Sequence, residues 1–340
     1  SYANSYSIIQ SLAKQDPTNA PLQSDLSMTF FRIGDVLTKQ GKLDEALEAY
    51  QSCHAIRKSL AERDSANSKW QNDLSMSFIR VGDTFKDKER RDEALAAYQD
   101  SLRIKKILIE QDPSNASLQG GLCISLEKVG DALMAQGKNE EALKFYEDSL
   151  VIRKTLADKD PSNAYWRRGP GASLEKMGDA LMALQKGDDA LKAYQDALEI
   201  RKKLVDQEPS NAAFKHELST GFEKLGDAFL ETKNLGDAFN SYQDSFQIRR
   251  ALVDQDSSNA DWQKSLAVSH EKLGVVAERK GESANASEYY LRSLQIFQAL
   301  ANANPTNRQL NENLRRIRGR LDTLASLPAN AQTTDLLIRP

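Results

Sequence analysis

Residues 30–50 read FFRIGDVLTKQGKLDEALEAY, and their pattern is the most informative part of the sequence about the fold. Apolar residues recur in it at helical spacing, first from Phe30 to Leu37 and then from Ala46 to Tyr50. Between the two patterns lies Gln40-Gly41-Lys42, a composition typical of a short turn. The stretch therefore predicts two amphipathic helices joined by a tight connection.

The same pattern recurs every 48 residues without insertion or deletion. It carries alanine from Ala46 to Ala286, tyrosine from Tyr50 to Tyr290, and glycine at Gly34, Gly82, Gly130, Gly178, Gly226 and Gly274. A fixed period of this length indicates a repeat architecture. A glycine inside a helix costs about 1 kcal/mol relative to alanine, so each copy marks a place where a larger side chain would not fit. We expect Gly34 and Ala46 to be the points of closest approach within a helix pair.

Short polar segments separate the repeats. Asp112-Pro-Ser-Asn115 is typical, and close variants occupy the equivalent places. Proline disfavours helix in the residue before it, and a following serine or asparagine can cap the next helix. With about 20 residues each, the predicted helices are roughly 30 Å long.

Residues 30–50 resemble the tetratricopeptide repeat. The signature positions are filled by Phe30, Ile33, Gly34, Leu37, Ala46 and Tyr50. The family unit has about 34 residues, so this chain is similar to long-helix variants such as kinesin light chain-type or bacterial signalling-associated arrays. The Asn-Asn pair characteristic of the light chains is absent, so their cargo preference is not implied. The resemblance implies an all-α, right-handed superhelical solenoid of antiparallel helix pairs.

The register of the repeat predicts the organisation of the chain. Residues 1–19 match the second helix of a repeat, so we expect an incomplete upstream repeat there and further repeats or another domain before it. Residues 20–307 contain six repeats. Residues 308–327 are rich in arginine and read as a capping helix, which closes the last apolar face of a solenoid. Residues 328–340 read as a tail, whose Leu336-Leu-Ile338 could dock on the groove or on a neighbouring molecule, or simply be mobile.

Composition excludes several classes of function. The net charge of −3 gives no basic field for nucleic acid. We find neither an apolar run long enough to span a membrane nor a leader sequence, and we expect a cytoplasmic protein. Cys53 and Cys123 lie 70 residues apart without metal-ligand spacing, so we assign them to packing.

The chain lacks the motifs of catalysis. No phosphate-binding glycine loop occurs, and the three histidines, His54, His216 and His270, occupy unrelated positions of the repeat. Tryptophan recurs every 96 residues, at Trp70, Trp166 and Trp262, which we interpret as core positions. The sequence therefore predicts no enzyme, cofactor or metal site.

In the tetratricopeptide family the first helix of each repeat lines the concave face, and the resemblance implies that this face carries a ladder of charges. Its bases include Arg32, Arg80, Lys128, Lys176 and Lys224, and acids follow three residues later at Asp35, Asp83, Asp131, Asp179 and Asp227. Residues three apart are neighbours on a helix. Two interpretations stay open: the charges pair within and between repeats, or they offer donors and acceptors to an extended peptide.

Two further columns of this face change along the chain. The residue before the base is apolar in Phe31 and Ile79 but acidic in Glu127 and Glu175, and the residue four before it is Met28 or Met76 in the first two repeats. Clustered Met and aromatic side chains are typical of adaptable recognition sites. We hypothesise that Met28, Phe31, Met76 and Ile79 anchor a ligand; alternatively, they pack against the missing upstream repeat.

The function predicted from these features is a protein- or peptide-binding scaffold. The alternative is the sensory or regulatory arm of a larger multidomain signalling enzyme. We expect no binding of chaperone tails, because aspartate replaces the carboxylate-gripping asparagine at positions 35, 83 and 131. We expect neither nucleic acid nor membrane as a partner.

Overall fold

The computed structural model describes residues 11, 13 and 15–326. This part of the chain consists of thirteen α-helices joined by short turns, so the predicted all-α fold is confirmed. The chain divides into two compact units, residues 1–180 and 181–340, and each is described by itself. Most of the predicted segment 1–19 and all of the predicted tail 328–340 lie outside the described residues.

The helices alternate between 20 and 21 residues until the last, which has 18. Those of the first unit are α2 (Ala20–Lys39), α3 (Leu43–Arg63), α4 (Ser68–Asp87), α5 (Arg91–Gln111), α6 (Ala116–Ala135) and α7 (Asn139–Lys159). Helix α8 (Ala164–Ala183) begins in the first unit and ends in the second. The second unit continues with α9 (Gly187–Gln207), α10 (Ala212–Glu231), α11 (Leu235–Gln255), α12 (Ala260–Arg279), α13 (Ser283–Ala303) and α14 (Arg308–Ala325).

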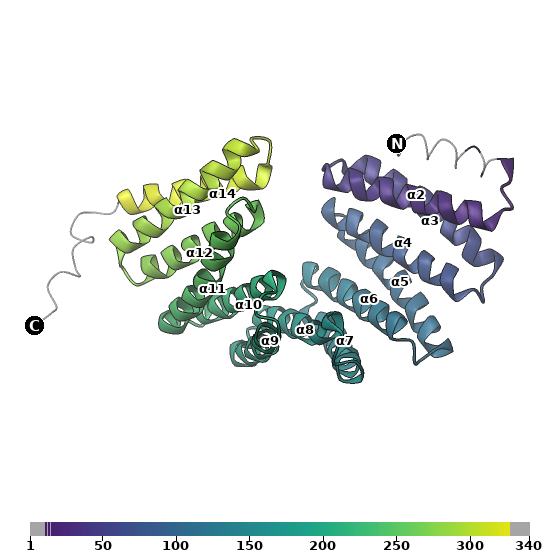
Figure 1. Ribbon diagram of the computed structural model, residues 1–340, viewed down its shortest axis with the longest axis horizontal. Coiled ribbons are helices and arrows are strands. Elements are labelled where there is room, and N and C mark those ends of the chain that lie inside the picture. Colours follow the sequence, from purple (N-terminus) through teal and green to yellow (C-terminus); the bar gives the residue numbers. More distant parts are fainter. Residues whose placement is uncertain (1–10, 12, 14, 327–340) are drawn as a thin grey trace, which may run out of the picture. The chain divides into compact units, whose positions relative to one another are not determined.

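Packing follows the order of the chain within each unit. In the first unit, α2 packs on α3, α4 on α5 and α6 on α7, and α3 also packs on α4 and α5 on α6 (Figure 1). In the second unit α13 packs on α14. This confirms the predicted stack of antiparallel helix pairs.

Asparagine caps set the beginning of the first helices. The side-chain oxygen of Asn67 accepts a hydrogen bond from the backbone N–H of Trp70 at 3.2 Å, and Asn115 caps Leu118 at 3.1 Å. Such a cap satisfies an N–H that has no partner inside the helix. The predicted capping is therefore confirmed, and asparagine supplies it.

A residue with positive φ ends each first helix. It is glycine in three turns, including Gly137 at 75°, but Glu89, with φ of 60°, takes this place between α4 and α5. Residues with a side chain avoid this backbone region, since the Cβ atom crowds the following carbonyl. The turn is therefore strained in some repeats and relaxed in others.

The repeated glycine packs against the repeated tyrosine. A Cβ atom built on Gly82 would lie 2.6 Å from a ring carbon of Tyr98, and one on Gly130 would lie 2.5 Å from Tyr146. The same contact recurs at Gly34, Gly226 and Gly274. The close approach predicted at the glycine is real, and its partner is the tyrosine ring beside the buried alanine.

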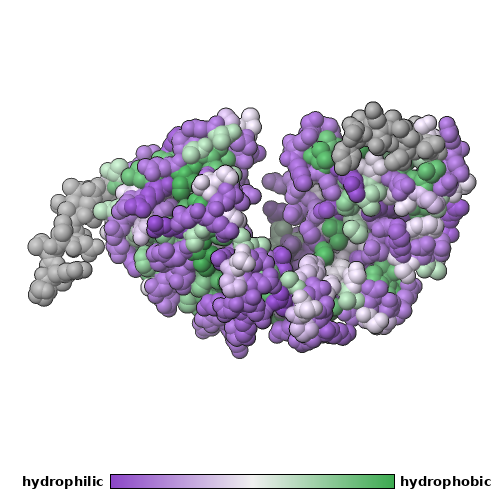
Figure 2. All heavy atoms as spheres, in the orientation of Figure 1, coloured by the Kyte–Doolittle hydropathy of each residue, from purple (hydrophilic) through white to green (hydrophobic). Residues whose placement is uncertain are grey.

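Small and aromatic residues fill the core of the first unit. Ala94, Tyr98, Val129 and Ala142 are at most 1% exposed and belong to one cluster that joins α5, α6 and α7. On the face of each unit seen in Figure 2, hydrophilic residues predominate and hydrophobic ones reach the surface in small patches. No helix among the described residues is both apolar and long enough to cross a membrane.

Candidate functional site

The basic ladder of the first helices pairs with the repeat before it. Lys128 Nζ lies 2.6 Å from Asp83 Oδ1, and Lys176 Nζ lies 2.5 Å from Asp131 Oδ1. The same oxygen of Asp83 accepts a hydrogen bond from the Tyr98 hydroxyl at 2.8 Å. Pairing between neighbouring repeats, one of the two interpretations of the ladder, is therefore present in the structure.

The ladder continues into the second unit and the last helix. Lys272 Nζ lies 2.6 Å from Asp227 Oδ1, which repeats the contact of the first unit. Arg320 occupies the next equivalent position in α14 and contacts Glu278 Oε2 at 3.0 Å, one helical turn beyond the place where the other repeats have aspartate. The predicted capping segment thus takes part in the same network.

The hydroxyls of the repeated tyrosines remain donors in this network. Burial, together with the nearby Asp83 carboxylate, raises the pKa of Tyr98 far above its ordinary value, and burial raises that of Tyr50 to about 12. A neutral hydroxyl can donate to the aspartate, whereas a phenolate would be repelled by it. The tyrosine hydroxyl therefore holds in place the aspartate that forms the ion pair with the lysine of the next repeat.

A second column of bases lies inside the stack and was missed by the sequence analysis. Its members follow the repeated isoleucine of the second helices and are at most 8% exposed: Arg57, Lys105, Arg153, Arg201 and Arg249. The signal was available, because the basic residue recurs at the 48-residue step until Phe297 replaces it. A buried base needs a counter-charge or other polar partners.

Glutamates of the first helices supply this counter-charge in several repeats. Arg153 Nε and Nη2 donate to the two oxygens of Glu127 at 2.8 and 3.0 Å, and Arg249 pairs with Glu223 at 2.5 Å. Glu127 is only 8% exposed, and its Oε1 also accepts from Ser149 at 2.8 Å. The glutamate column therefore balances buried bases inside the fold.

The first two repeats depart from this scheme. In the repeat of α2 and α3, Phe31 stands at the glutamate position, and Arg57 donates to the Asp73 backbone carbonyl at 2.8 Å instead. The repeat of α4 and α5 differs in another way. Ile79 stands at the glutamate position, so Lys105, which is 3% exposed, has no carboxylate within 4.0 Å among the described residues. Its Nζ donates to Asn72 Oδ1. Burial lowers the pKa of the Lys105 ammonium to about 8, although the more distant Asp73 carboxylate opposes this change.

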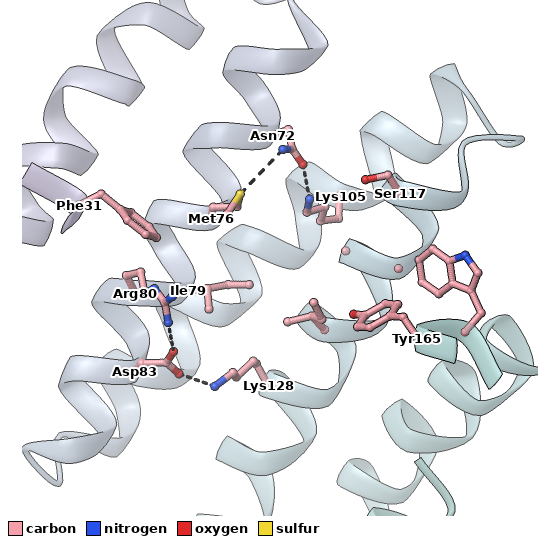
Figure 3. Close-up of a pocket in the computed structure, with 14 residues that line it drawn as sticks. Phe31, Asn72, Met76, Ile79, Arg80, Asp83, Lys105, Ser117, Lys128 and Tyr165 are labelled. Carbon is pink, nitrogen blue, oxygen red and sulfur yellow. Dashed lines mark hydrogen bonds and ion pairs between the residues drawn. The ribbon is translucent and has the colours of Figure 1, made fainter. Parts of the chain in front are cut away.

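Lys105 lines a cavity of about 460 Å³ in the first unit. Apolar side chains form much of its wall, contributed by Phe31, Met76, Ile79, Ile124, Tyr165 and Trp166. The charged side chains are Arg80, Asp83, Lys105 and Lys128, and in the view of Figure 3 Ile79 lies between Lys105 and the Arg80–Asp83–Lys128 group.

Two adjacent glycines of α6 make room for this cavity. A Cβ atom on Gly121 would lie 2.6 Å from Lys105 Nζ, and one on Gly120 would lie 2.6 Å from the ring of Trp166. At the position of Gly121 the preceding repeat has Asp73. Trp166, which the sequence analysis assigned to the core, lies against Gly120 and lines the cavity.

The structure brings together six of the residues predicted as a binding surface: Phe31, Met76, Ile79, Arg80, Asp83 and Lys128.

Met28 is 42% exposed but does not line the cavity. Arg32 is exposed, and Asp35 accepts from the Tyr50 hydroxyl at 2.7 Å. Asp131, Lys176 and Asp227 form ion pairs of the basic ladder. Glu175 is buried, with 8% of its surface exposed. The Lys224 ammonium lies 6.0 Å from the ring centroid of Tyr194. Asp179, half-buried in α8, does not line the cavity.

The histidines and cysteines lie in packed surroundings. His54 contacts the ring of Phe78 at 4.4 Å between centroids, and Cys53 and Cys123 are both buried and free. Burial raises the pKa of each of these two thiols to about 11, so both stay protonated near neutral pH. The described residues include no group of three or more potential metal ligands.

Three regions of the chain match a known family model. The family model of the tetratricopeptide repeat matches residues 32–67, 123–162 and 171–210. These three regions are similar to tetratricopeptide repeats, which confirms the resemblance seen in the sequence. No curated protein matches it.

Solved structures share the fold at low sequence identity. BtubC (BKLC) from P. vanneervenii matches with a TM-score of 0.58 and 16% identity, over 76% of this chain and 92% of the other. The apo form of RapI matches with a TM-score of 0.51 and 14% identity, over 87% of this chain and 99% of the other. Kinesin light chain-like repeats from Podosopora anserina match with a TM-score of 0.49 and 17% identity, over 69% and 98%.

Proposed function

We propose that this protein is a peptide- or protein-binding scaffold and that the cavity between α4, α6 and the start of α8 anchors a segment of its partner. The observation that carries the proposal is the cavity itself, where apolar walls meet fixed charges. Binding sites for peptides and small ligands commonly combine an apolar surface with a few oriented polar groups. The tetratricopeptide repeats of the chain support an interaction role in general.

Met76 is an accessible apolar anchor of the cavity. It is 42% exposed, and a thioether side chain can adapt to different partner residues. Ile79 and Tyr165 also line the cavity, so an extended segment could place more than one apolar side chain here (Figure 3). We propose a non-catalytic protein of the cytoplasm. A sensory arm of a larger signalling enzyme would use the same cavity for binding.

The proposal is tested by selecting binders from a random peptide library on the wild-type chain and measuring their affinity by fluorescence polarisation. Met76→Arg places a charge and extra bulk in the cavity and should weaken the selected peptides by about tenfold or more, or roughly 1.4 kcal/mol. Val151→Arg is the matched control, because Val151 is 66% exposed on α7 and outside the cavity.

Two results would overturn the proposal: a selection that yields no binder, or binders that tolerate Met76→Arg as well as Val151→Arg. Met28→Arg measures the extent of the site, because Met28 occupies the position of Met76 one repeat earlier and is equally exposed. A similar loss in this variant would extend the site onto α2.

A further inference from the structure

The buried ammonium of Lys105 has an amide partner in Asn72 but, among the described residues, no carboxylate partner. In the pair α6 and α7, Arg153 is held by both oxygens of Glu127. In the pair α4 and α5 the base is still present and buried as Lys105, but the acid is replaced by Ile79. Lys105 therefore lacks the carboxylate that balances Arg153. Arg57 of the preceding pair lacks it as well, since Phe31 takes the glutamate position there, but Arg57 donates to the Asp73 backbone carbonyl at 2.8 Å.

The place of the missing carboxylate is open to a ligand. Lys105 and Ile79 both line the cavity, and Gly121 leaves the space that the ammonium occupies. The cavity is lined by three cations, Arg80, Lys105 and Lys128, and by one anion, Asp83, so its lining carries a net charge of 3 − 1 = +2. Asp83 is already bound to Lys128 at 2.6 Å and contacts Arg80 at 3.8 Å, which leaves Lys105 as the base without an acid.

We infer that the cavity binds a carboxylate of a peptide segment, that this carboxylate pairs with Lys105 in place of the absent glutamate, and that an apolar residue beside it lies on Met76, Ile79 and Tyr165. The inference rests on the proposed function and specifies its ligand: an aspartate or glutamate flanked by an apolar side chain. A carboxylate is favoured over a larger anion because the fold itself uses a carboxylate for the equivalent base, in Glu127 and Glu223.

The electrostatics of Lys105 agree with this assignment. A buried ammonium without a counter-charge is unfavourable, which is why burial lowers its pKa to about 8. A carboxylate at hydrogen-bond distance stabilises the charged form, so the ligand would relieve a cost already present in the free protein. Asn72, which accepts from Lys105 Nζ, keeps the ammonium at the wall of the cavity (Figure 3).

The experiment compares two forms of each peptide selected on the wild-type chain. Both forms are acetylated and amidated, and one carries glutamine where the other carries the acid. The wild-type chain should prefer the acidic form by about tenfold or more, since a hydrogen bond to a charged group is lost with glutamine. In Lys105→Met the two forms should bind equally. Lys106→Met, a change of the exposed neighbouring lysine, should keep the wild-type preference.

A second variant supplies the missing acid within the chain. Ile79→Glu restores the residue found at this position in the later repeats, and its carboxylate should pair with Lys105 as Glu127 pairs with Arg153. Affinity for the acidic peptide should fall by about tenfold or more, because the site of the ligand carboxylate is filled. The melting temperature should rise, which shows that the loss is not caused by unfolding.

The outcomes separate the inference from the proposed function. An acidic preference that is absent in the wild-type chain, or that persists in Lys105→Met, overturns the inference. The proposed scaffold function still stands if Met76→Arg weakens binding while Val151→Arg does not. If the acidic preference is lost in Arg80→Met but kept in Lys105→Met, the peptide carboxylate binds the basic ladder. That result also overturns the inference. Tighter binding of a free C-terminal carboxylate, or of phosphoserine at the acidic position, overturns the side-chain assignment. Binders that ignore Met76→Arg refute the proposed function itself.

Discussion

The helix pairs α4–α5 and α6–α7 share one framework and differ in one charge. Gly82 packs on Tyr98 in the first pair as Gly130 packs on Tyr146 in the second. The first pair holds a buried lysine opposite an isoleucine, whereas the second holds a buried arginine bound to a glutamate. The comparison teaches that the glycine and tyrosine determine how the helices pack, while the balance of buried charge can change from repeat to repeat.

The last pair of the second unit shows a third way to balance this position. There Phe297 replaces the base, which would leave Glu271 buried without its usual partner. Arg316 of α14 donates to both oxygens of Glu271 instead, at 2.7 and 2.8 Å. The fold thus supplies a substitute cation where a base is lost, which makes the unmatched Lys105 of α5 more notable.

The largest loss of stability is expected when the buried ion pair between Glu127 and Arg153 is broken. Glu127→Ile gives α6–α7 the arrangement of α4–α5 and leaves Arg153 buried without its carboxylate. Removing one partner of a buried ion pair typically costs about 3–5 kcal/mol, so urea unfolding should show a loss of that order. The double variant Glu127→Ile/Arg153→Met should recover more than half of the loss. A single variant as stable as the wild-type chain would show that this ion pair does not support the fold.

The framework shared by the two pairs should respond equally in both. Gly82→Ala and Gly130→Ala place a Cβ atom within 2.6 Å of a buried tyrosine ring, and overpacking of this kind costs about 1–3 kcal/mol. Gly319→Ala is the control, since nothing lies within 4 Å of its added Cβ atom in α14. Helix propensity should make that variant more stable by up to about 1 kcal/mol. Thermal unfolding of the three variants gives the comparison, and a stabilised Gly130→Ala would refute the role of the tyrosine contact.

The helix pairs and their tight contact at the glycine could be predicted from the sequence, because Gly34 and its copies recur at the same position of the repeat. A 48-residue period fixes the helices, the asparagine caps and the position of the tight contact, all of which are local or depend on the same neighbour in every repeat. The partner of the glycine was less evident, because helical periodicity marks which residues are buried but not which of them touch. Tyr50 and Ala46 fit the buried face equally well.

The site was only partly predictable from the sequence. Phe31, Met76 and Ile79 stood out because their column changes along the chain, and all three line the cavity. Lys105 was missed because a lysine among other charged residues of a helix looks exposed. Its burial depends on contact with the next repeat, where Gly121 replaces a larger residue. Comparing the glutamate column with the column of second-helix bases would have exposed the mismatch.

The unmatched charge should also make stability depend on pH. The pKa of Lys105 is about 8 in the folded chain and near 10.5 in lysine without this burial, so the unfolded chain binds this proton more tightly. Stability must then rise with pH above about 8. From pH 7 to about 9.5, the wild-type chain should gain roughly 1–2 kcal/mol relative to Lys105→Met. Urea titrations stop at that pH, because tyrosines of the unfolded chain ionise near 10 and act in the opposite direction. A constant difference between the two chains would contradict the lowered pKa.

The smallest effect concerns the turn, where the two pairs differ in backbone strain. Glu89 ends α4 with φ of 60°, while Gly137 holds the equivalent place after α6 with φ of 75°. Both positions are exposed, and a Cβ atom on Gly137 would meet nothing within 4 Å, so exchange of side chains here changes mainly the backbone. Glu89→Gly should stabilise the protein by roughly 0.5–1 kcal/mol, because relief of the left-handed conformation exceeds the added freedom of the unfolded chain. Gly137→Ala should destabilise it by a similar amount. If thermal unfolding shows changes of the same sign in both variants, positive φ is not the reason that glycine and glutamate differ at this turn.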